Sequence, residues 1–220
     1  MEMTIELLRA RFLTTQLAGD RREAVRLTVD EGLRRGAPFD VLQDQVIGAA
    51  QRELGDMWER HEISIAQEHL ATAIAQLSLA ALFEHAPAGP RVHRSLLIAC
   101  VEGELHDVPA RLVADVLELA GFDVRYLGAS VPHAELVEAV HRERPDAIGL
   151  SVTTSSNLSA LRTAVARLRE AHAAPVFVGG LALDLSSTDV EAYGVPACRG
   201  SPAALIATAR RVTGLDVSAA

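Results

Sequence analysis

The sequence predicts an α/β protein: an N-terminal four-helix bundle followed by a Rossmann-like (flavodoxin-like) doubly wound parallel sheet of five strands. Apolar residues recur at helical spacing from the start of the chain to about residue 85. After residue 94, short apolar runs alternate with amphipathic helical segments, a pattern typical of βαβ units. This change of period predicts two domains of different architecture.

Four predicted helices with short connections make up the bundle. Gly19-Asp20 and Gly36-Ala37-Pro38 interrupt the helical pattern and separate the first three helices. The third is expected over Phe39 to about Arg60. The fourth begins at Ser64, because "SIAQ" matches a capping box in which Ser64 caps the helix and Gln67 reaches back.

A linker is expected between the two domains. Residues 86–94, "APAGPRVHR", contain two prolines and a glycine and show no periodicity. The sequence thus predicts a helical domain over 1–85 and a Rossmann-like domain over 95–220.

The second domain shows strand and helix signals in alternation. The expected strands are "SLLIACV", "DVRYL", "DAIGLSV", "PVFVGG" and a brief one at 197–199. Helices are expected over 109–120, 133–144, 157–171 and 201–212, with a short one at 186–194. In such a sheet, ligands bind beyond the C-terminal ends of the strands.

Composition limits the classes of function. The formal net charge is −8, which argues against direct DNA binding, because nucleic-acid-binding surfaces usually carry a basic patch. No apolar run reaches about 18 residues and the N-terminus does not resemble a secretion signal, so neither a membrane span nor export is expected. Two cysteines without a pairing pattern favour a reduced, cytoplasmic protein.

The loop after the first strand, "EGELHDVPA", carries a candidate metal ligand. His106 lies between two acidic residues, Glu104 and Asp107. A carboxylate beside a histidine can hold the imidazole in one tautomer and leave the other nitrogen for a metal. Taken alone, the loop is equally consistent with a solvated polar segment.

Two further loops have a structural and a functional interpretation. "SVTTSSN" after the third strand could cap the next helix or hydrogen-bond a polar ligand. Gly179-Gly180 after the fourth strand could form a turn or let a ligand approach the backbone. Neither loop matches a phosphate-binding signature, and the chain has no zinc-type spacing of Cys and His.

The order of these signals resembles the cobalamin-binding domain signature D-x-H-x-x-G … S-x-L … G-G. The matching positions are His106, Ser151-Val152-Thr153 and Gly179-Gly180. Three positions depart from it: Glu104 replaces Asp, Thr153 replaces Leu and Pro109 replaces Gly. The first change keeps the carboxylate, whereas Pro109 is bulkier than Gly and lacks a donor.

A second motif, in the helical domain, points to one group of cobalamin-binding proteins. Trp58 and Glu68-His69 resemble the W-x9-E-H motif of adenosylcobalamin-dependent photoreceptors, known as light-sensitive regulators of carotenoid synthesis. The resemblance implies that His106 is the lower axial ligand of cobalt, and that cleavage of the adenosyl group by light rearranges the domains. His69 and His61 are the candidates for an upper ligand after light.

The same resemblance implies the cofactor contacts. Trp58, Glu68 and His69 would cover the adenosyl group. The other contacts would come from the three loops of the second domain: Glu104, Asp107, Val108, Ser151, Val152, Thr153, Gly179 and Gly180.

Several functions stay open within this resemblance. A sensor would not be an enzyme; it would signal to a protein partner and could form a light-dependent homo-oligomer. A further possibility is an anti-repressor that binds a transcription factor rather than DNA. Because the chain starts directly with the bundle, no helix-turn-helix domain is expected.

One alternative is a corrinoid methyl carrier of a methyltransferase system. Another is a stand-alone photocobilin, which binds a bilin such as biliverdin alongside cobalamin.

Overall fold

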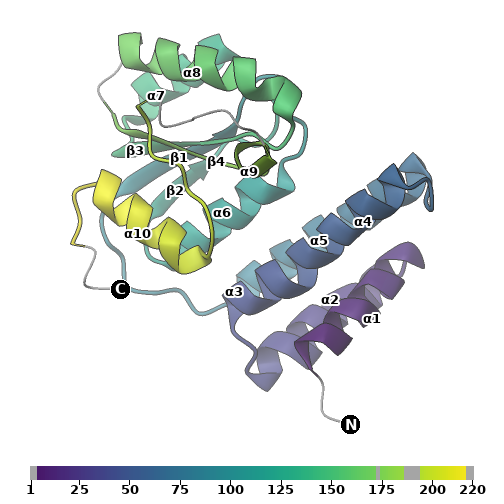
Figure 1. Cartoon of the computed structure of the whole chain (residues 1–220). Helices are drawn as coiled ribbons and strands as arrows, with labels where there is room; N and C mark the ends of the chain where they lie inside the picture. The colour runs from purple at the N-terminus through teal and green to yellow at the C-terminus, as the bar shows by residue number, and fades with distance from the viewer. Residues whose placement is uncertain (1–3, 172–173, 186–193, 217–220) are drawn as a thin grey trace. The chain divides into compact units, whose positions relative to one another are not determined.

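The computed structural model describes residues 4–171, 174–185 and 194–216. The chain divides between Pro87 and Ala88 into two compact units, one helical and one α/β (Figure 1). No helix in these described ranges is long and apolar enough to cross a membrane.

The helical unit follows the predicted order of four helices. The second and the third each contain a π-helical segment within the expected α-helix. Its elements are α1 (Ile5–Leu17), α2 (Arg21–Arg26), η1 (Leu27–Gly32), η2 (Leu33–Arg35), α3 (Phe39–Val41), η3 (Leu42–Gly48), α4 (Ala49–Glu59) and α5 (Ile65–His85). The segments η1 and η3 are π-helical, a wider winding than the α-helix expected there. A Cβ on Gly32 would lie 2.7 Å from Leu42 Cδ2, so the two π-helical segments pack closely where glycine leaves room.

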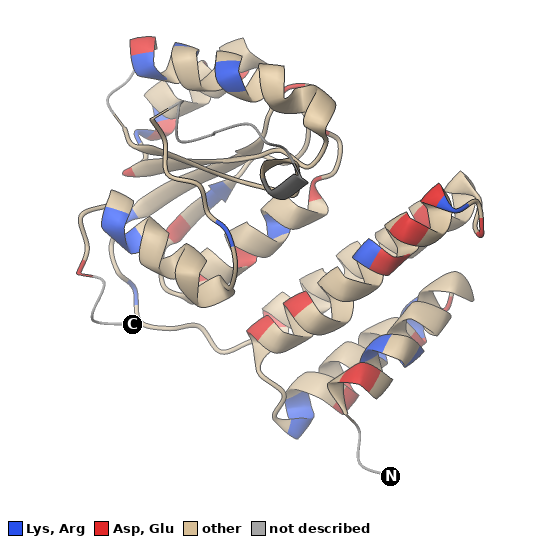
Figure 2. Ribbon diagram, in the orientation of Figure 1, with Lys and Arg blue, Asp and Glu red and all other residues tan. Residues whose placement is uncertain are grey.

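An aliphatic core fills this unit, as the scarcity of aromatic residues requires. Leu8, Phe12, Leu42, Leu54 and Leu79 are fully buried. Acidic and basic residues are interspersed along the helices (Figure 2), and several form exposed ion pairs, such as Arg34 with Asp30. Exposed ion pairs of this kind contribute little to stability, so burial of the apolar faces holds the unit together.

The capping box at the start of α5 is confirmed. The Gln67 N–H donates to Ser64 Oγ over 3.3 Å, and the Ser64 N–H donates to Gln67 Oε1 over 2.9 Å. These two bonds satisfy backbone donors that a helix end leaves unpaired, and they fix where α5 begins.

The second unit is a parallel sheet with helices on both faces, as predicted. Its strands are β1 (Ser95–Cys100), β2 (Asp123–Tyr126), β3 (Ala147–Ser151) and β4 (Val176–Gly179), in the order β2-β1-β3-β4. Its helices are α6 (Val108–Leu119), α7 (His133–Glu143), η4 (Ser155–Asn157), α8 (Leu158–Ala171), α9 (Ala182–Leu185) and α10 (Pro202–Val212). Figure 1 shows α7 and α8 on one face of the sheet and α6 and α10 on the other.

The prediction of five strands is wrong for the part of the chain that the structure describes, where the sheet has four. In place of a fifth strand, Ala197 forms one isolated parallel bridge with Val178. The chain cannot continue the ladder, because Gly200 turns it (φ +92°) into α10. The short helix expected at 186–194 lies outside the described residues except for its last position.

Strand register brings three loops together. Cys100 pairs with Ser151, and Ser151 pairs with Gly179, so β1, β3 and β4 end side by side. The chain then leaves β1 for α6 on one face and β3 for α8 on the other. This divergence opens the crevice in which doubly wound sheets bind ligands.

Removing the capping box should destabilise the helical unit. We expect Ser64→Ala to lower the free energy of unfolding by about 1 kcal/mol, since the Gln67 N–H loses its side-chain acceptor. Urea unfolding followed by circular dichroism measures the loss. Ser64→Asp is the matched control, because it keeps an acceptor at the cap; an equal loss in both variants would contradict the assignment.

Candidate functional site

A single exposed histidine dominates the loop between β1 and α6. The His106 side chain is 65% exposed, while its Nδ1 lies 2.6 Å from Glu104 Oε1. A carboxylate accepts but does not donate, so this contact favours the tautomer with the proton on Nδ1. The lone pair of Nε2 is then available to a metal.

Buried Glu104 ties this loop to the loop after β3. Its Oε1 also accepts from the His106 N–H at 3.0 Å. Its Oε2 accepts from the backbone N–H groups of Thr153 and Thr154 at 2.9 and 2.8 Å, and from Asn157 Nδ2 at 3.1 Å. One carboxylate therefore joins five donors across two loops.

These contacts keep Glu104 ionised. Burial by itself raises the pKa of this carboxyl, but hydrogen bonds from the Thr154 and His106 backbones, and then from the Asn157 and His106 side chains, outweigh it. The net effect lowers the pKa from 4.5 to about 2. At neutral pH a full negative charge thus faces the imidazole.

Thr154 and Asn157 are site residues that sequence reasoning missed. The Thr154 hydroxyl lies 3.3 Å from His106 Nδ1 and makes no capping bond at η4. Asn157, at the end of η4, reaches both Glu104 and the carbonyl of Gly103. The hydroxyl and amide side chains of "TTSSN" indicate that this loop can form hydrogen bonds, but only the fold shows which of them lie near His106 and Glu104.

The two positions after His106 are structural anchors. The Tyr126 hydroxyl donates to the Asp107 carbonyl at 3.1 Å, and Val108, which begins α6, is buried. Beneath the loop, burial first, and then the charges of Asp107 and Glu104, raise the pKa of the Cys100 thiol to about 12. Cys100 is therefore a protonated core thiol at neutral pH, which excludes it as a thiolate ligand.

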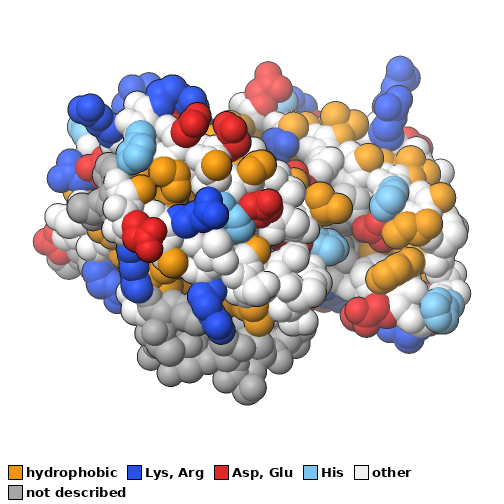
Figure 3. All heavy atoms as spheres, turned by 90° about the horizontal axis from the view of Figure 1, so that it is seen from above, with side chains coloured by type: hydrophobic (Ala, Val, Ile, Leu, Met, Phe, Trp, Pro, Cys, Tyr) orange, Lys and Arg blue, Asp and Glu red, His pale blue; other side chains and the backbone are white. Residues whose placement is uncertain are grey.

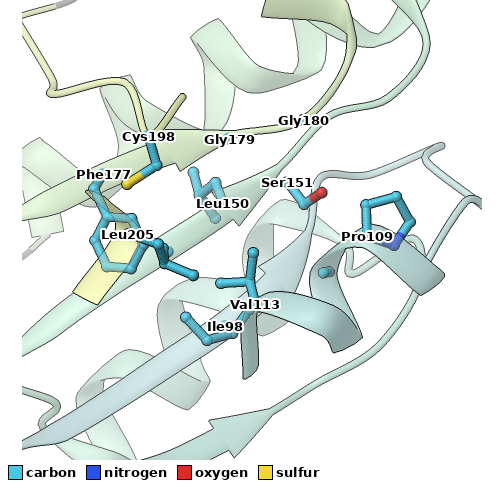
Figure 4. A pocket seen from close by; sticks show the side chains of 12 residues that line it. Ile98, Pro109, Val113, Leu150, Ser151, Phe177, Gly179, Gly180, Cys198 and Leu205 are labelled. Carbon is cyan, nitrogen blue, oxygen red and sulfur yellow. The ribbon is translucent and has the colours of Figure 1, made fainter. Parts of the chain in front are cut away.

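A small cavity opens between the strand ends and α6 (Figure 4). It measures about 80 Å³ and is mainly apolar, with Ser151 supplying a hydroxyl. Its lining includes Ile98, Pro109, Val113, Phe177, Gly179 and Gly180. Gly149, in the middle of β3, also lines it, and a Cβ there would lie 2.6 Å from Ile98 Cδ1 and 2.7 Å from Phe177 Cζ.

The two adjacent glycines have different roles. Gly180 adopts φ +116°, and a Cβ on it would lie 2.1 Å from the carbonyl oxygen of Val152, so only glycine allows this turn. A Cβ on Gly179 would meet only ordinary contacts with Cys198. Gly180 therefore holds the loops after β3 and β4 together, and Gly179 leaves the cavity wall open.

On the helical unit, the other predicted residues lie near the joint of α4 and α5. Trp58 is 45% exposed and Ile65 is 50% exposed, so neither is a core residue. His69 is exposed, and its Nε2 lies 3.7 Å from Glu68 Oε2. His61 is also exposed and lies in the joint itself, with φ +59°. Sequence reasoning missed Ile65, which directly follows the helix cap.

The surface around this joint mixes apolar and histidine side chains. In Figure 3, hydrophobic, charged and histidine side chains are exposed together on the helical unit. An exposed tryptophan and isoleucine offer apolar contact area, and an adjacent carboxylate offers a hydrogen-bond acceptor. Such a surface suits an organic group with both an aromatic face and hydroxyl groups.

The residues of the α/β unit fit a metal that brings most of its own ligands. Within the described ranges, no three His, Cys, Asp or Glu side chains gather to hold an ion. His106 offers one bond from an oriented imidazole, and a mainly apolar cavity lies between the strand ends and α6. A corrinoid supplies the remaining cobalt ligands from its macrocycle and carries a nucleotide tail.

Comparison with known families gives two matches. Models of the B12 binding domain match residues 94–204, which span the α/β unit from just before β1 into α10, and residues 8–83, which span the helical unit. The first match contains His106, Glu104 and all residues that line the cavity except Leu205. Together the two matches cover most of the chain.

Curated relatives fall into two groups. The chain is 35% identical over 156 residues to the HTH-type transcriptional repressor CarH of Myxococcus xanthus, covering 70% of this chain and 51% of the repressor. It is 27% identical over 164 residues to dimethylamine corrinoid protein 1 of Methanosarcina acetivorans, covering 72% and 76% of the two chains. The chain thus spans about half the length of the repressor.

Among solved structures, the monomethylamine corrinoid protein of Methanosarcina barkeri superposes with a TM-score of 0.78 over 95% of this chain and 100% of that one. Its sequence is 20% identical, so the likeness shows a common fold.

The Glu104 carboxylate should stabilise the α/β unit in a pH-dependent way. We expect Glu104→Gln to lower the free energy of unfolding by about 1–3 kcal/mol at pH 7. The new NH₂ group would face backbone N–H groups that donate to the carboxylate in the wild type, and two donors cannot form a hydrogen bond. The folded pKa lies below the unfolded one, so this stabilisation is complete above pH 4.5 and is lost as the pH falls toward 2.

Urea midpoints between pH 7 and pH 3 test this dependence in the unloaded protein. Glu170→Gln, at an exposed position near the end of α8, is the matched control and should have little effect at any pH. A Glu104→Gln deficit that stays constant from pH 7 to pH 3 would contradict the ionised-carboxylate assignment.

Proposed function

The chain belongs to the B12-binding domain family, and we propose that it is a light sensor that holds adenosylcobalamin on His106 and signals to a protein partner. The observation that carries cofactor binding is the exposed imidazole of His106 held by the buried Glu104 carboxylate. The sensor assignment draws on the exposed Trp58 and on the resemblance of Trp58, Glu68 and His69 to the photoreceptor motif.

In this proposal, His106 binds cobalt through Nε2. Glu104 keeps the proton on Nδ1 and fixes the orientation of the ring, as carboxylates do behind metal-bound histidines. Ser151, Val152, Thr153, Gly179 and Gly180 hold the nucleotide tail at the cavity between the strand ends. Asp107 and Val108 begin α6 and keep the loop closed against Tyr126.

The helical unit covers the adenosyl group. When bound, adenosylcobalamin supplies a cobalt–carbon bond that light breaks, and that chemistry belongs to the cofactor. Trp58 would pack on the adenosyl group, Glu68 would accept hydrogen bonds from its hydroxyls, and His69 would donate to it. Without that group these side chains would lack a partner, and His69 or His61 would be available for a new contact. The lost packing is the change that a domain rearrangement can amplify.

A second candidate function is methyl transport. The similarity to a dimethylamine corrinoid protein covers most of both chains, and the fold matches that of a monomethylamine corrinoid protein. A carrier would use the same lower ligand and would pass a methyl group between partner enzymes without being an enzyme itself. The tryptophan and the Glu-His pair favour the sensor.

His106 should be needed for cobalamin binding. We expect His106→Ala to weaken the affinity for hydroxocobalamin by more than about tenfold and to change the absorbance spectrum of any cofactor that remains bound, because the axial nitrogen is lost. Titration followed by absorbance measures both. His85→Ala is the matched control, because His85 is exposed and its Nδ1 contacts Ala81 O of its own helix. Equal affinity and spectrum in wild type and His106→Ala would refute the ligand assignment.

Illumination should change the shape or assembly of the loaded protein. We expect adenosylcobalamin-loaded chains to change their elution volume and small-angle scattering after green light, since the adenosyl group that Trp58 contacts departs. A hydroxocobalamin-loaded sample has no adenosyl group to lose and should not change. Trp58→Ala should reduce the change in the loaded protein.

Results that differ from this expectation would favour one of the other functions. Identical scattering before and after light would contradict the sensor. If chains loaded with hydroxocobalamin, and reduced to the Co(I) state by an added reductant, then accept a methyl group from a methylamine donor through a corrinoid methyltransferase, the carrier function holds instead. A red absorbance band gained on co-expression with biliverdin would extend the proposal to a second chromophore.

A further inference from the structure

A chain of hydrogen bonds runs through the helical unit from a buried glutamine to Glu68. Gln16 Nε2, on α1, lies 3.0 Å from Gln51 Oε1, on α4. Gln51 Nε2 lies 2.8 Å from Thr72 Oγ1, and Thr72 Oγ1 lies 2.8 Å from Glu68 Oε1. Three helices thus contribute to one line of polar contacts that ends at a carboxylate.

The carboxylate sets the direction of every bond in this line. Ionised Glu68 can only accept, so the single hydrogen of the Thr72 hydroxyl points to it. Thr72 must then accept from the Gln51 NH₂ group, which turns the Gln51 oxygen toward Gln16. The Gln16 amide donates in its turn. All the donors therefore point the same way, an arrangement in which neighbouring bonds strengthen one another.

The buried end of the line has an unsatisfied atom. Gln16 is fully buried, and its Nε2 makes a second bond to the carbonyl of Ala71, so both amide hydrogens are used. Its Oε1 is buried without a hydrogen-bond partner in the described part of the chain. Rotating the amide would place this oxygen against two other acceptors. The core thus tolerates one unpaired acceptor while the amide donates toward Gln51.

We propose that Gln16, Gln51 and Thr72 are positioning residues that hold the Glu68 carboxylate for hydroxyl groups of the upper ligand, an inference that rests on the proposed function. Glu68 Oε1 is engaged by Thr72, whereas Oε2 faces His69 at 3.7 Å and has capacity for further donors. The adenosyl group carries ribose hydroxyls that can donate to this acceptor, and a water or hydroxide ligand lacks them. The line of bonds thereby contributes to selection among cobalamin forms.

Thr72→Val tests the relay because it keeps the shape of the side chain and removes the hydroxyl. We expect the ratio of the affinities for adenosylcobalamin and hydroxocobalamin to fall about tenfold, on the scale of one lost hydrogen bond to a charged group. Thr72→Ser restores the hydroxyl and should restore the ratio. Thr14→Val is the matched control, because the Thr14 hydroxyl bonds only to the carbonyl of Ala10 in its own helix. A purely structural role would lower both affinities together and leave the ratio unchanged.

A second readout uses the protein without cofactor. In ¹⁵N-resolved NMR spectra, the side-chain amide signals of Gln51 should shift in Thr72→Val and in Glu68→Gln, and should stay in place in Thr14→Val. Unshifted Gln51 signals in both variants would overturn the relay irrespective of any cofactor.

Comparison with Glu68→Gln separates the possible failures. If Glu68→Gln lowers the affinity ratio and Thr72→Val does not, the relay is wrong and the proposed function stands. If neither variant changes the ratio, Glu68 does not contact the upper ligand. That result would overturn both this inference and the assignment of Glu68 in the proposed function.

Discussion

The buried carboxylate of Glu104 is the interaction on which the rest of the site depends. It accepts two hydrogen bonds from His106 and three from the loop after β3, so two loops share one negative charge. Desolvating a carboxylate is costly unless it is surrounded by donors, and here five donors meet that requirement. The exposed imidazole is therefore rigid although it lies in a loop.

Sheet register makes this arrangement possible. Cys100, Ser151 and Gly179 lie in line across β1, β3 and β4, so segments far apart in the chain emerge next to one another. Glu104 replaces the shorter aspartate of the general motif, and its side chain reaches both Thr153 and Thr154 from the first loop. Gly180 and Gly149 then keep the backbone contact and the cavity free of side chains.

The two units use carboxylates in comparable ways. In the α/β unit, donors surround Glu104 and leave one nitrogen of His106 exposed. In the helical unit, a line of donors from Gln16 reaches one oxygen of Glu68, and the second oxygen faces His69. In both units, hydrogen bonds that are at least partly buried fix a polar group and leave part of it available to a ligand. Preorganisation of this kind lowers the entropy cost of binding a ligand.

The sequence by itself determined the order of the elements along the chain. Hydrophobic periodicity predicted the helices and four of the five expected strands, and "SIAQ" predicted the start of α5. These features are local, since each depends on residues that are neighbours in the chain. The ligand site at His106, Ser151 and Gly179 rests on a motif resemblance and stays a prediction.

Only the tertiary structure decided which side chains meet. Thr154 and Asn157 join Glu104 because β1 and β3 are adjacent, and Gln16 reaches Thr72 through Gln51 because α1, α4 and α5 pack together. The π-helical segments and the single bridge at Ala197 likewise depend on packing around Gly32 and on the turn at Gly200. Such contacts join residues distant in sequence, and no local period encodes them.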